Sequence, residues 1–316
     1  MGEEAAVEAQ AAVKIAAKAD AITMGRGRMA HNPTVLPRTM PGQTLGEAVA
    51  GRLQGGDGES LGRLLDSEPI VNCYLRSELR LGPSLGHWWG VSGDDGLSAA
   101  LLSGGIAVPW IPHLADAAAL VAALRQEGAL PRMLVGPRDP VLALHEALGL
   151  PAREIRDPQP LVTLHRDDVL RTDTGDVPLR LATRADLEGI TVAAAAMHHE
   201  EMGIDPLTID ADGWRARMTN LIDRGWSWVW IEGGEVIFKA ELSAWMPDVV
   251  QLQGVYTAPA HRGRGRAEAG LAAVCAMVFS DVPVCSLYVN GYNAAARRLY
   301  DKLGFRHHCE FATVIY

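Results

Sequence analysis

The chain has 316 residues, of which 48% are hydrophobic, and carries a net charge of −9. This length can bury more than one core, so we expect two domains, and the acidic balance excludes a general nucleic-acid binder, which needs a basic face. No stretch approaches the ~18 apolar residues of a membrane span, and the four cysteines lack metal-ligand spacing. We therefore expect a cytoplasmic protein without a metal, a membrane partner or a nucleic-acid partner.

The first part of the chain, residues 1–42, joins an alanine-rich segment to a segment with three prolines between residues 23 and 41. Alanine, glutamate and lysine favour a helix over 3–20, but few large side chains are present to pack it against a core. We predict a disordered tail here. A helix over 3–20 that docks on the folded part is the alternative.

Residues 43–166 form the first predicted domain. Hydrophobic periodicity predicts helices over 45–53, 61–65, 70–79, 115–126 and 140–148 and strands over 87–92, 97–109 and 133–135. These elements follow the order of the elements in the second half of the chain, so we interpret this domain as a degenerate copy of that half. No glycine-rich loop follows any of its predicted strands. An unrelated α/β accessory domain is the alternative.

A polar segment over 167–177, rich in aspartate, predicts a linker to the second domain at 178–316. Periodicity predicts strands over 178–182, 226–231, 235–245, 249–257, 284–289 and 310–316 and helices over 185–201, 212–224, 264–279 and 294–302. Gly233 and Gly234 predict a tight hairpin between two of the strands. Trp226, Trp228 and Trp230 alternate, which places them on one face, in the core or, alternatively, in a pocket wall.

The segment from Val255 to Ala267 carries the strongest functional signal. An apolar strand passes through a proline turn into Arg262-Gly263-Arg264-Gly265-Arg266-Ala267, which opens a helix. Unpaired backbone N–H groups and the helix dipole favour an anion at such a helix start. Two other phosphate loops are excluded, because a nucleoside-triphosphatase loop needs Gly-Lys-Ser/Thr and a dinucleotide loop needs a third glycine where Glu268 stands.

A second motif follows the strand predicted over 284–289. Asn293 has the position of an N-cap for a helix that Lys302 and Gly304 end. Tyr300 lies seven residues beyond Asn293, which is about two helical turns. The side chains of Asn293 and Tyr300 can therefore face one cleft.

With these two motifs in this order and spacing, residues 178–316 resemble the GNAT N-acetyltransferase superfamily. The chain is also similar, over its whole folded length, to bacterial GNAT proteins with an additional N-terminal region of unknown function. The resemblance implies an α/β (α+β) fold, with a mixed central sheet of the GNAT type in the C-terminal half and a degenerate GNAT-like N-terminal half.

The resemblance also implies roles for particular residues. The loop would hold the pyrophosphate of acetyl-CoA as co-substrate, the strand before it would present backbone groups to the pantetheine and the acetyl carbonyl, and the later helix would supply a cofactor contact and an acid for the departing thiolate. The loop residues are Arg262, Gly263, Arg264, Gly265, Arg266 and Ala267, and the strand residues are Val255, Tyr256 and Thr257. The cofactor contact on the later helix would be Asn293, and the acid would be Tyr300. Two residues depart from the family pattern: Arg266 replaces an apolar residue, and Glu268 puts a carboxylate near the phosphate.

Acidic residues at two places are candidates for the acceptor side. Glu241 interrupts an apolar strand next to the predicted splayed one, and it is the best candidate for the catalytic base if it faces the cleft. A pair with Lys239 or an arginine on the open face of the sheet is the alternative. Glu200 and Glu201 end the first helix of this domain and would attract a cationic amine, and a solvated helix end is the alternative.

These features predict an N-acetyltransferase that moves an acetyl group from acetyl-CoA to a primary amine of a small molecule or a peptide by direct attack. The alternative is a non-catalytic acyl-CoA-binding or regulatory protein on the same fold. The sequence does not identify the acceptor. It also does not determine the oligomeric state, for which a homodimer is one option.

Overall fold

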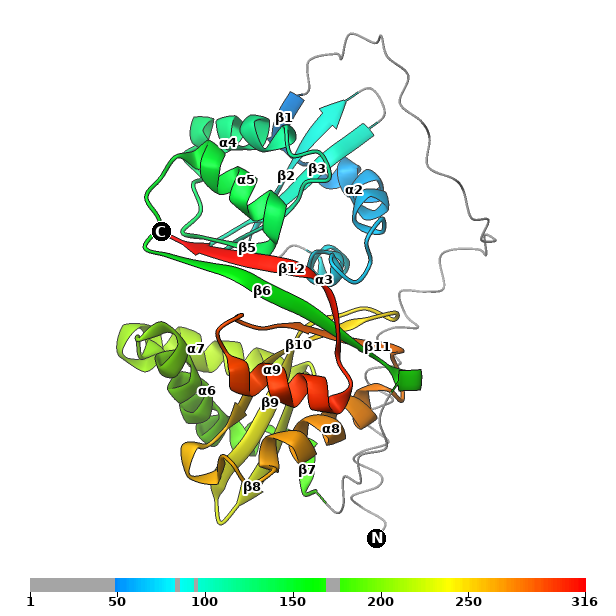
Figure 1. The fold of residues 1–316 in the computed structure, drawn as a ribbon. Helices are drawn as coiled ribbons and strands as arrows, with labels where there is room; N and C mark the ends of the chain where they lie inside the picture. Colours follow the sequence, from blue (N-terminus) through cyan, green and yellow to red (C-terminus); the bar gives the residue numbers. More distant parts are fainter. Residues whose placement is uncertain (1–48, 83–85, 94–95, 169–176) are drawn as a thin grey trace. The chain divides into compact units, whose positions relative to one another are not determined.

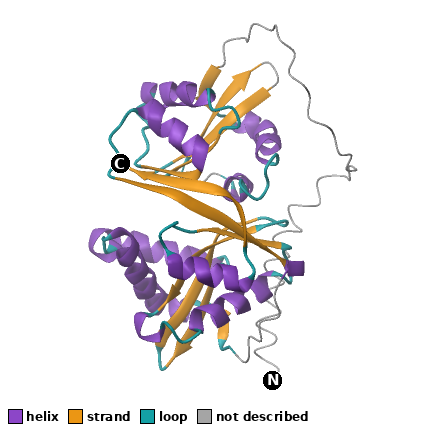
Figure 2. Ribbon diagram, in the orientation of Figure 1, coloured by secondary structure: helices purple, strands orange, loops and turns teal. Residues whose placement is uncertain are grey.

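A twelve-stranded mixed sheet runs through the part of the chain that the computed structural model describes, which is residues 49–82, 86–93, 96–168 and 177–316 (Figures 1 and 2). The predicted tail at 1–42 and most of the predicted linker at 167–177 lie outside these residues. Within the described ranges, no helix is long and apolar enough to cross a membrane.

The N-terminal half supplies six strands and four helices among the described residues. They are β1 (Val49–Arg52), α2 (Gly58–Leu65), α3 (Cys73–Leu81), β2 (His87–Gly93), β3 (Gly96–Ser103), β4 (Ala107–Trp110), α4 (Asp116–Gln126), β5 (Met133–Pro137), α5 (Arg138–Leu148) and β6 (Glu154–His165).

The C-terminal half repeats the same succession of strands and helices. It contains β7 (Leu179–Leu181), α6 (Leu187–Met202), α7 (Pro206–Asp223), β8 (Ser227–Glu232), β9 (Glu235–Trp245), β10 (Val250–Thr257), α8 (Arg266–Val278), β11 (Val284–Tyr288), α9 (Ala294–Leu303) and β12 (Arg306–Ile315). The predicted order of elements in this half is confirmed, and so is the expectation that the first half copies it.

The two halves exchange their last strands. The sheet order is β1-β2-β3-β4-β5-β12-β6-β11-β10-β9-β8-β7, so β6 inserts between β11 and β12, and β12 inserts between β5 and β6 (Figure 1). All of these pairings are antiparallel. Neither half therefore completes its sheet from its own sequence range, and contacts join Ala48–Tyr316 into a single compact unit.

Three predictions for the first half and one for the last strand need correction. The helix predicted over 45–53 is wrong where it is described, because Val49–Arg52 pairs with β2 as an edge strand. The single strand predicted over 97–109 is the hairpin of β3 and β4. No element was predicted over 149–165, where β6 forms, and the last strand begins at Arg306 and not at residue 310.

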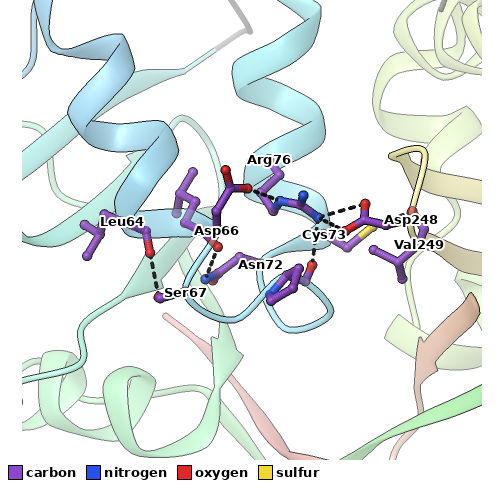
Figure 3. A network of polar contacts seen from close by, with 10 residues as sticks. Leu64, Asp66, Ser67, Asn72, Cys73, Arg76, Asp248 and Val249 are labelled. Carbon is purple, nitrogen blue, oxygen red and sulfur yellow. Dashed lines mark hydrogen bonds and ion pairs between the residues drawn. The ribbon is translucent and has the colours of Figure 1, made fainter. Parts of the chain in front are cut away.

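A polar network links α3 to the turn between β9 and β10 (Figure 3). The Arg76 side chain, only 12% exposed, donates to Asp66 at 2.7 Å and to Asp248 at 2.9 Å. The Cys73 thiol donates to the Val249 carbonyl at 3.4 Å, and burial raises the pKa of this thiol well above its usual range. The first half thus anchors the residues that lead into β10.

A capping box fixes the start of α6. Asp186 is buried and accepts hydrogen bonds from the Thr183 N–H at 2.8 Å and from both terminal nitrogens of Arg180 at 2.7 and 2.8 Å. The Arg180 hydrogen bonds, with help from Thr183 and against desolvation, lower the pKa of the Asp186 carboxyl to about 2. The network orients α6, whose other end carries Glu200 and Glu201.

Asp186→Asn is expected to lower the free energy of unfolding at pH 7 by about 1–2 kcal/mol, because it removes the charged acceptor of this network. The folded pKa lies below the unfolded value of about 3.9, so the stabilisation is complete above about pH 4 and is lost as the pH falls towards 2. Urea unfolding of both proteins at several pH values measures the difference. A gap between them that stays constant down to about pH 2.5 would contradict the assignment.

Candidate active site

Strands β10 and β11 separate soon after they meet. Their parallel pairing covers Val250 with Cys285 and Gln251 with Ser286. Beyond these pairs β11 continues along β6, with Tyr288 opposite Leu161 and the Val289 N–H donating to the Pro160 carbonyl at 3.1 Å. The edge of β10 from residue 252 to 257 therefore opens away from β11, and the predicted residues Val255, Tyr256 and Thr257 lie on it.

A bulge shapes this open edge. The register between β10 and β9 shifts between Gln253 and Tyr256, and Gly254 has a φ of +61°. A Cβ at position 254 would lie 2.7 Å from Glu241 Oε2 and 3.1 Å from Lys239 Nζ. Glycine is required here by both the left-handed backbone and the close approach.

Glu241 and Lys239 form a buried ion pair behind the bulge. Lys239 is 0% exposed and Glu241 is 3% exposed, and Lys239 Nζ donates to Glu241 Oε1 at 2.7 Å and to the Gly254 carbonyl at 3.1 Å. Glu241 thus pairs with Lys239, as the alternative had it, but the pair is buried and does not lie on an open face, and its carboxylate is not a free base. The pair instead holds the bulge of β10.

The glycine-rich loop has the backbone geometry of an anion site. Gly263 and Gly265 have φ values of +70° and +76°, and Gly265 is the N-cap residue of α8. Among the described residues, no acceptor binds the N–H groups of residues 265–268. Nothing lies within 4 Å of a Cβ built on either glycine. Unpaired N–H groups at an open helix N-terminus favour a bound phosphate.

Two of the three loop arginines have acidic partners. Arg262 donates to both carboxylate oxygens of Glu200 at 2.8 and 3.0 Å and to the Thr257 carbonyl at 2.9 Å. Arg266 pairs with Glu232 and lies 4.6 Å above the Trp230 ring. Arg264 is exposed and has no ion-pair partner among the described residues, so it is the arginine available to a phosphate.

Two acidic residues near the loop, Glu268 and Glu200, are paired with basic partners. Glu268, in the first turn of α8, accepts from Lys302 of α9 at 2.6 Å. Glu200 is held by Arg262 and is therefore not a free acceptor-binding group as predicted. The repulsion that Glu268 would exert on a phosphate is reduced because its charge is paired.

The helix α9 carries both residues of the second motif, Asn293 at its start and Tyr300 near its end. Asn293 is the N-cap, and its Oδ1 accepts from the Ala296 N–H at 3.1 Å. Tyr300 is 8% exposed and its ring lies 5.7 Å from that of Phe305. Burial raises the pKa of Tyr300, and the nearby Glu201 carboxylate raises it further. The phenol therefore keeps its proton at neutral pH.

Glu201, at the end of α6, is the acidic residue that lies free near Tyr300. Its side chain is exposed, and no described side chain hydrogen-bonds its carboxylate. Desolvation raises the pKa of this carboxyl, while Arg156 and Lys239 oppose the rise. Arg156 also donates to the Glu201 carbonyl at 3.0 Å.

Sequence reasoning missed Arg156 and Tyr288 at this site. Arg156 belongs to β6, where no element was predicted, and the strand exchange brings it to α6. Tyr288 ends β11, is 38% exposed and stacks on Phe311 at 5.5 Å. Burial and the Glu201 charge raise the pKa of Tyr288, whereas Arg217 and Arg156 lower it. No group of metal-ligating side chains occurs within the described ranges.

The first half lacks the loop of the second. Residues 111–115 join β4 to α4 and contain no glycine, whereas residues 258–265 join β10 to α8 and contain both loop glycines. The strands β4 and β5 are parallel, as β10 and β11 are. The first half thus keeps the parallel strand pair and the following helix without the glycine-rich loop.

Two family models match the chain. Residues 195–305 match the acetyltransferase (GNAT) family, and residues 86–190 match a domain of unknown function (DUF4081). None of the curated proteins matches the chain.

Solved structures match most of the chain. A GNAT-family acetyltransferase from Colwellia psychrerythraea is 13% identical with a TM-score of 0.56, over 84% of this chain and 99% of that one. A tandem GNAT protein from the clavulanic acid biosynthesis pathway is 15% identical with a TM-score of 0.54, over 84% and 98%. A GCN5-related N-acetyltransferase from Sphaerobacter thermophilus is 16% identical with a TM-score of 0.55, over 86% and 96%. At these identities the likeness shows the GNAT fold, and its extent includes the N-terminal part.

Proposed function

We propose that this chain, which carries a GNAT acetyltransferase domain over residues 195–305, transfers an acetyl group from acetyl-CoA to a primary amine of a small molecule or a peptide. The family and the fold support acyl transfer in general. The observation that carries the finer proposal is the open edge of β10, which leads directly into the unpaired N–H groups of residues 265–268.

The donor would bind along this edge. Its pyrophosphate would accept hydrogen bonds from the N–H groups at the start of α8, with Arg264 as the free cation. Its pantetheine and acetyl carbonyl would lie along residues 252–257, where backbone N–H groups can polarise the carbonyl. Asn293, at the start of α9, would contact the donor near its thiol end.

Acyl transfer then needs one bond to form and one to break. The amine nitrogen attacks the thioester carbonyl carbon, the C–S bond breaks, and the departing thiolate takes the phenolic proton of Tyr300. A cationic amine first gives one proton to a carboxylate, which passes it to solvent, and the second proton, lost from the nitrogen after the attack, restores the phenol. Glu201 is the free carboxylate close to Tyr300, so we assign the attraction and deprotonation of the amine to Glu201 in place of Glu241.

Incubation of the protein with acetyl-CoA and a panel of primary amines, with free thiol as the readout, tests this proposal. Thiol release that depends on both substrates is the expected result. Tight binding of acetyl-CoA without turnover of any amine would instead favour the non-catalytic acyl-CoA-binding protein. A cytoplasmic location, the absence of a nucleic-acid or membrane partner, and a homodimer remain predictions.

The double variant Gly263→Ala/Gly265→Ala is expected to weaken coenzyme A binding by about tenfold or more. A non-glycine residue in the left-handed region costs about 1–2 kcal/mol, and relief of that strain turns the N–H groups away from the phosphate. Titration calorimetry with coenzyme A measures the affinity.

Gly233→Ala/Gly234→Ala is the matched control for this variant. Both residues also have positive φ values, +58° and +84°, but they lie in the turn between β8 and β9. This control should lose stability and keep its affinity. An equal loss of affinity in the two variants would mean that strain alone, and not the loop, weakens binding.

A further inference from the structure

An unpaired guanidinium lies on α7 beside the candidate cleft. Arg217 lies 5.7 Å above the Trp214 ring, whose other neighbour is the His198 ring at 5.1 Å. Within the described residues, no carboxylate lies within ion-pair distance of Arg217. Arg215 on the same helix pairs with Glu188, which shows that an exposed arginine here can find a partner when one is present.

The surroundings of Arg217 come from three other elements. Its charge lowers the pKa of His198 on α6, although desolvation is the larger cause of that shift. Burial raises the pKa of Tyr74 on α3 to about 12, and Arg217 opposes this rise. Desolvation and the Glu201 charge raise the pKa of Tyr288 on β11, and the Arg217 charge opposes this rise. Arg217 therefore lies where both halves of the chain contribute side chains.

The opposite charge in the same region belongs to Glu201. Glu201 lies three residues beyond His198 on α6, so the two side chains share a face of that helix, and the His198 ring lies 5.1 Å from the Trp214 ring that Arg217 covers. Arg156 fixes the backbone of Glu201 through a hydrogen bond of 3.0 Å. A free carboxylate at the end of α6 and a free guanidinium on the Trp214 ring of α7 thus lie on facing parts of two packed helices.

We infer that the acceptor carries an anionic group beside its amine, with Arg217 binding the anion while Glu201 receives the amine. This inference rests on the proposed acetyl transfer and names the class of its acceptor, an amino-acid-like zwitterion. The planar guanidinium group of an arginine binds a carboxylate or a phosphate through two parallel charge-assisted hydrogen bonds. A neutral amine of the same size would leave Arg217 without a partner, so it should be a poorer substrate.

Matched pairs of amines test the inference. Each pair has one anionic and one uncharged member: α-amino acids with their carboxamides, and phosphoethanolamine with ethanolamine. We expect a kcat/KM about 10- to 100-fold higher for the anionic member of at least one pair. The pair in which the preference occurs shows whether the anion is a carboxylate or a phosphate.

Arg217→Ala should abolish that preference and leave the rate with the uncharged member within about twofold. Arg217→Lys should restore part of it, and Arg215→Ala, which removes a paired charge two residues away, should keep all of it. Equal rates within every pair, or an equal loss for both members in Arg217→Ala, would overturn the inference while acetyl transfer stands. Turnover of no amine at all would overturn the proposed function as well.

Discussion

Tyr300→Phe is expected to lower kcat by about 10²- to 10⁴-fold, because the departing thiolate loses its proton donor. The phenylalanine ring can keep the contact with Phe305, and the loop at the start of α8 is untouched. Coenzyme A affinity should therefore stay unchanged. Free-thiol assays give kcat, and titration calorimetry gives the affinity.

Tyr292→Phe is the control for this change. Tyr292 is 70% exposed just before α9, so the loss of its hydroxyl should leave kcat unchanged. Because burial and Glu201 hold the pKa of Tyr300 above its usual value of about 10, the wild-type rate should not fall from loss of this proton below about pH 10. A Tyr300→Phe variant with wild-type kcat would remove Tyr300 from the mechanism.

Lys239→Met is expected to destabilise the protein by about 3–5 kcal/mol, since removing one partner of a buried ion pair leaves an uncompensated charge. Glu241 would remain buried beside Gly254 without the ammonium that binds both of them. Urea unfolding at pH 7 measures the free energy of unfolding. The bulge should also loosen, so coenzyme A affinity should fall in the same variant.

The double variant Lys239→Met/Glu241→Gln separates the charge from the packing. It removes both charges, so it should recover part of the lost stability. If Lys239→Met alone costs less than about 1 kcal/mol, or if the second substitution brings no recovery, the pair does not hold β10 as described.

Much of the C-terminal half could be predicted because its signals are local. The turn at Gly233 and Gly234, the N-cap at Asn293 and the glycines of the loop each depend on a few neighbouring residues. The Lys239 and Glu241 pair was also within reach, because residues two apart on a strand share a face. The burial of this pair could not be predicted from the sequence, because burial depends on the helices that cover β9.

The first half was harder to predict because distant segments determine it. Val49–Arg52 is a strand only through its pairing with β2. Strand β6 contains Pro158 and Pro160, which locally argue against a strand, and its ladder with β12 shifts register next to Pro158. Arg156 belongs to no motif, and only the assembled fold brings it to the Glu201 carbonyl.

The exchange of β6 and β12 has a consequence for synthesis of the chain. As the polypeptide leaves the ribosome, β5 emerges long before β12, its neighbour in the finished sheet. The nascent first half thus has an open strand edge until translation reaches residues 306–315, and such an edge can pair with other chains. Folding of the two halves is therefore coupled in time, and a chain that ends before β12 leaves the facing edges of β5 and β6 without their shared neighbour.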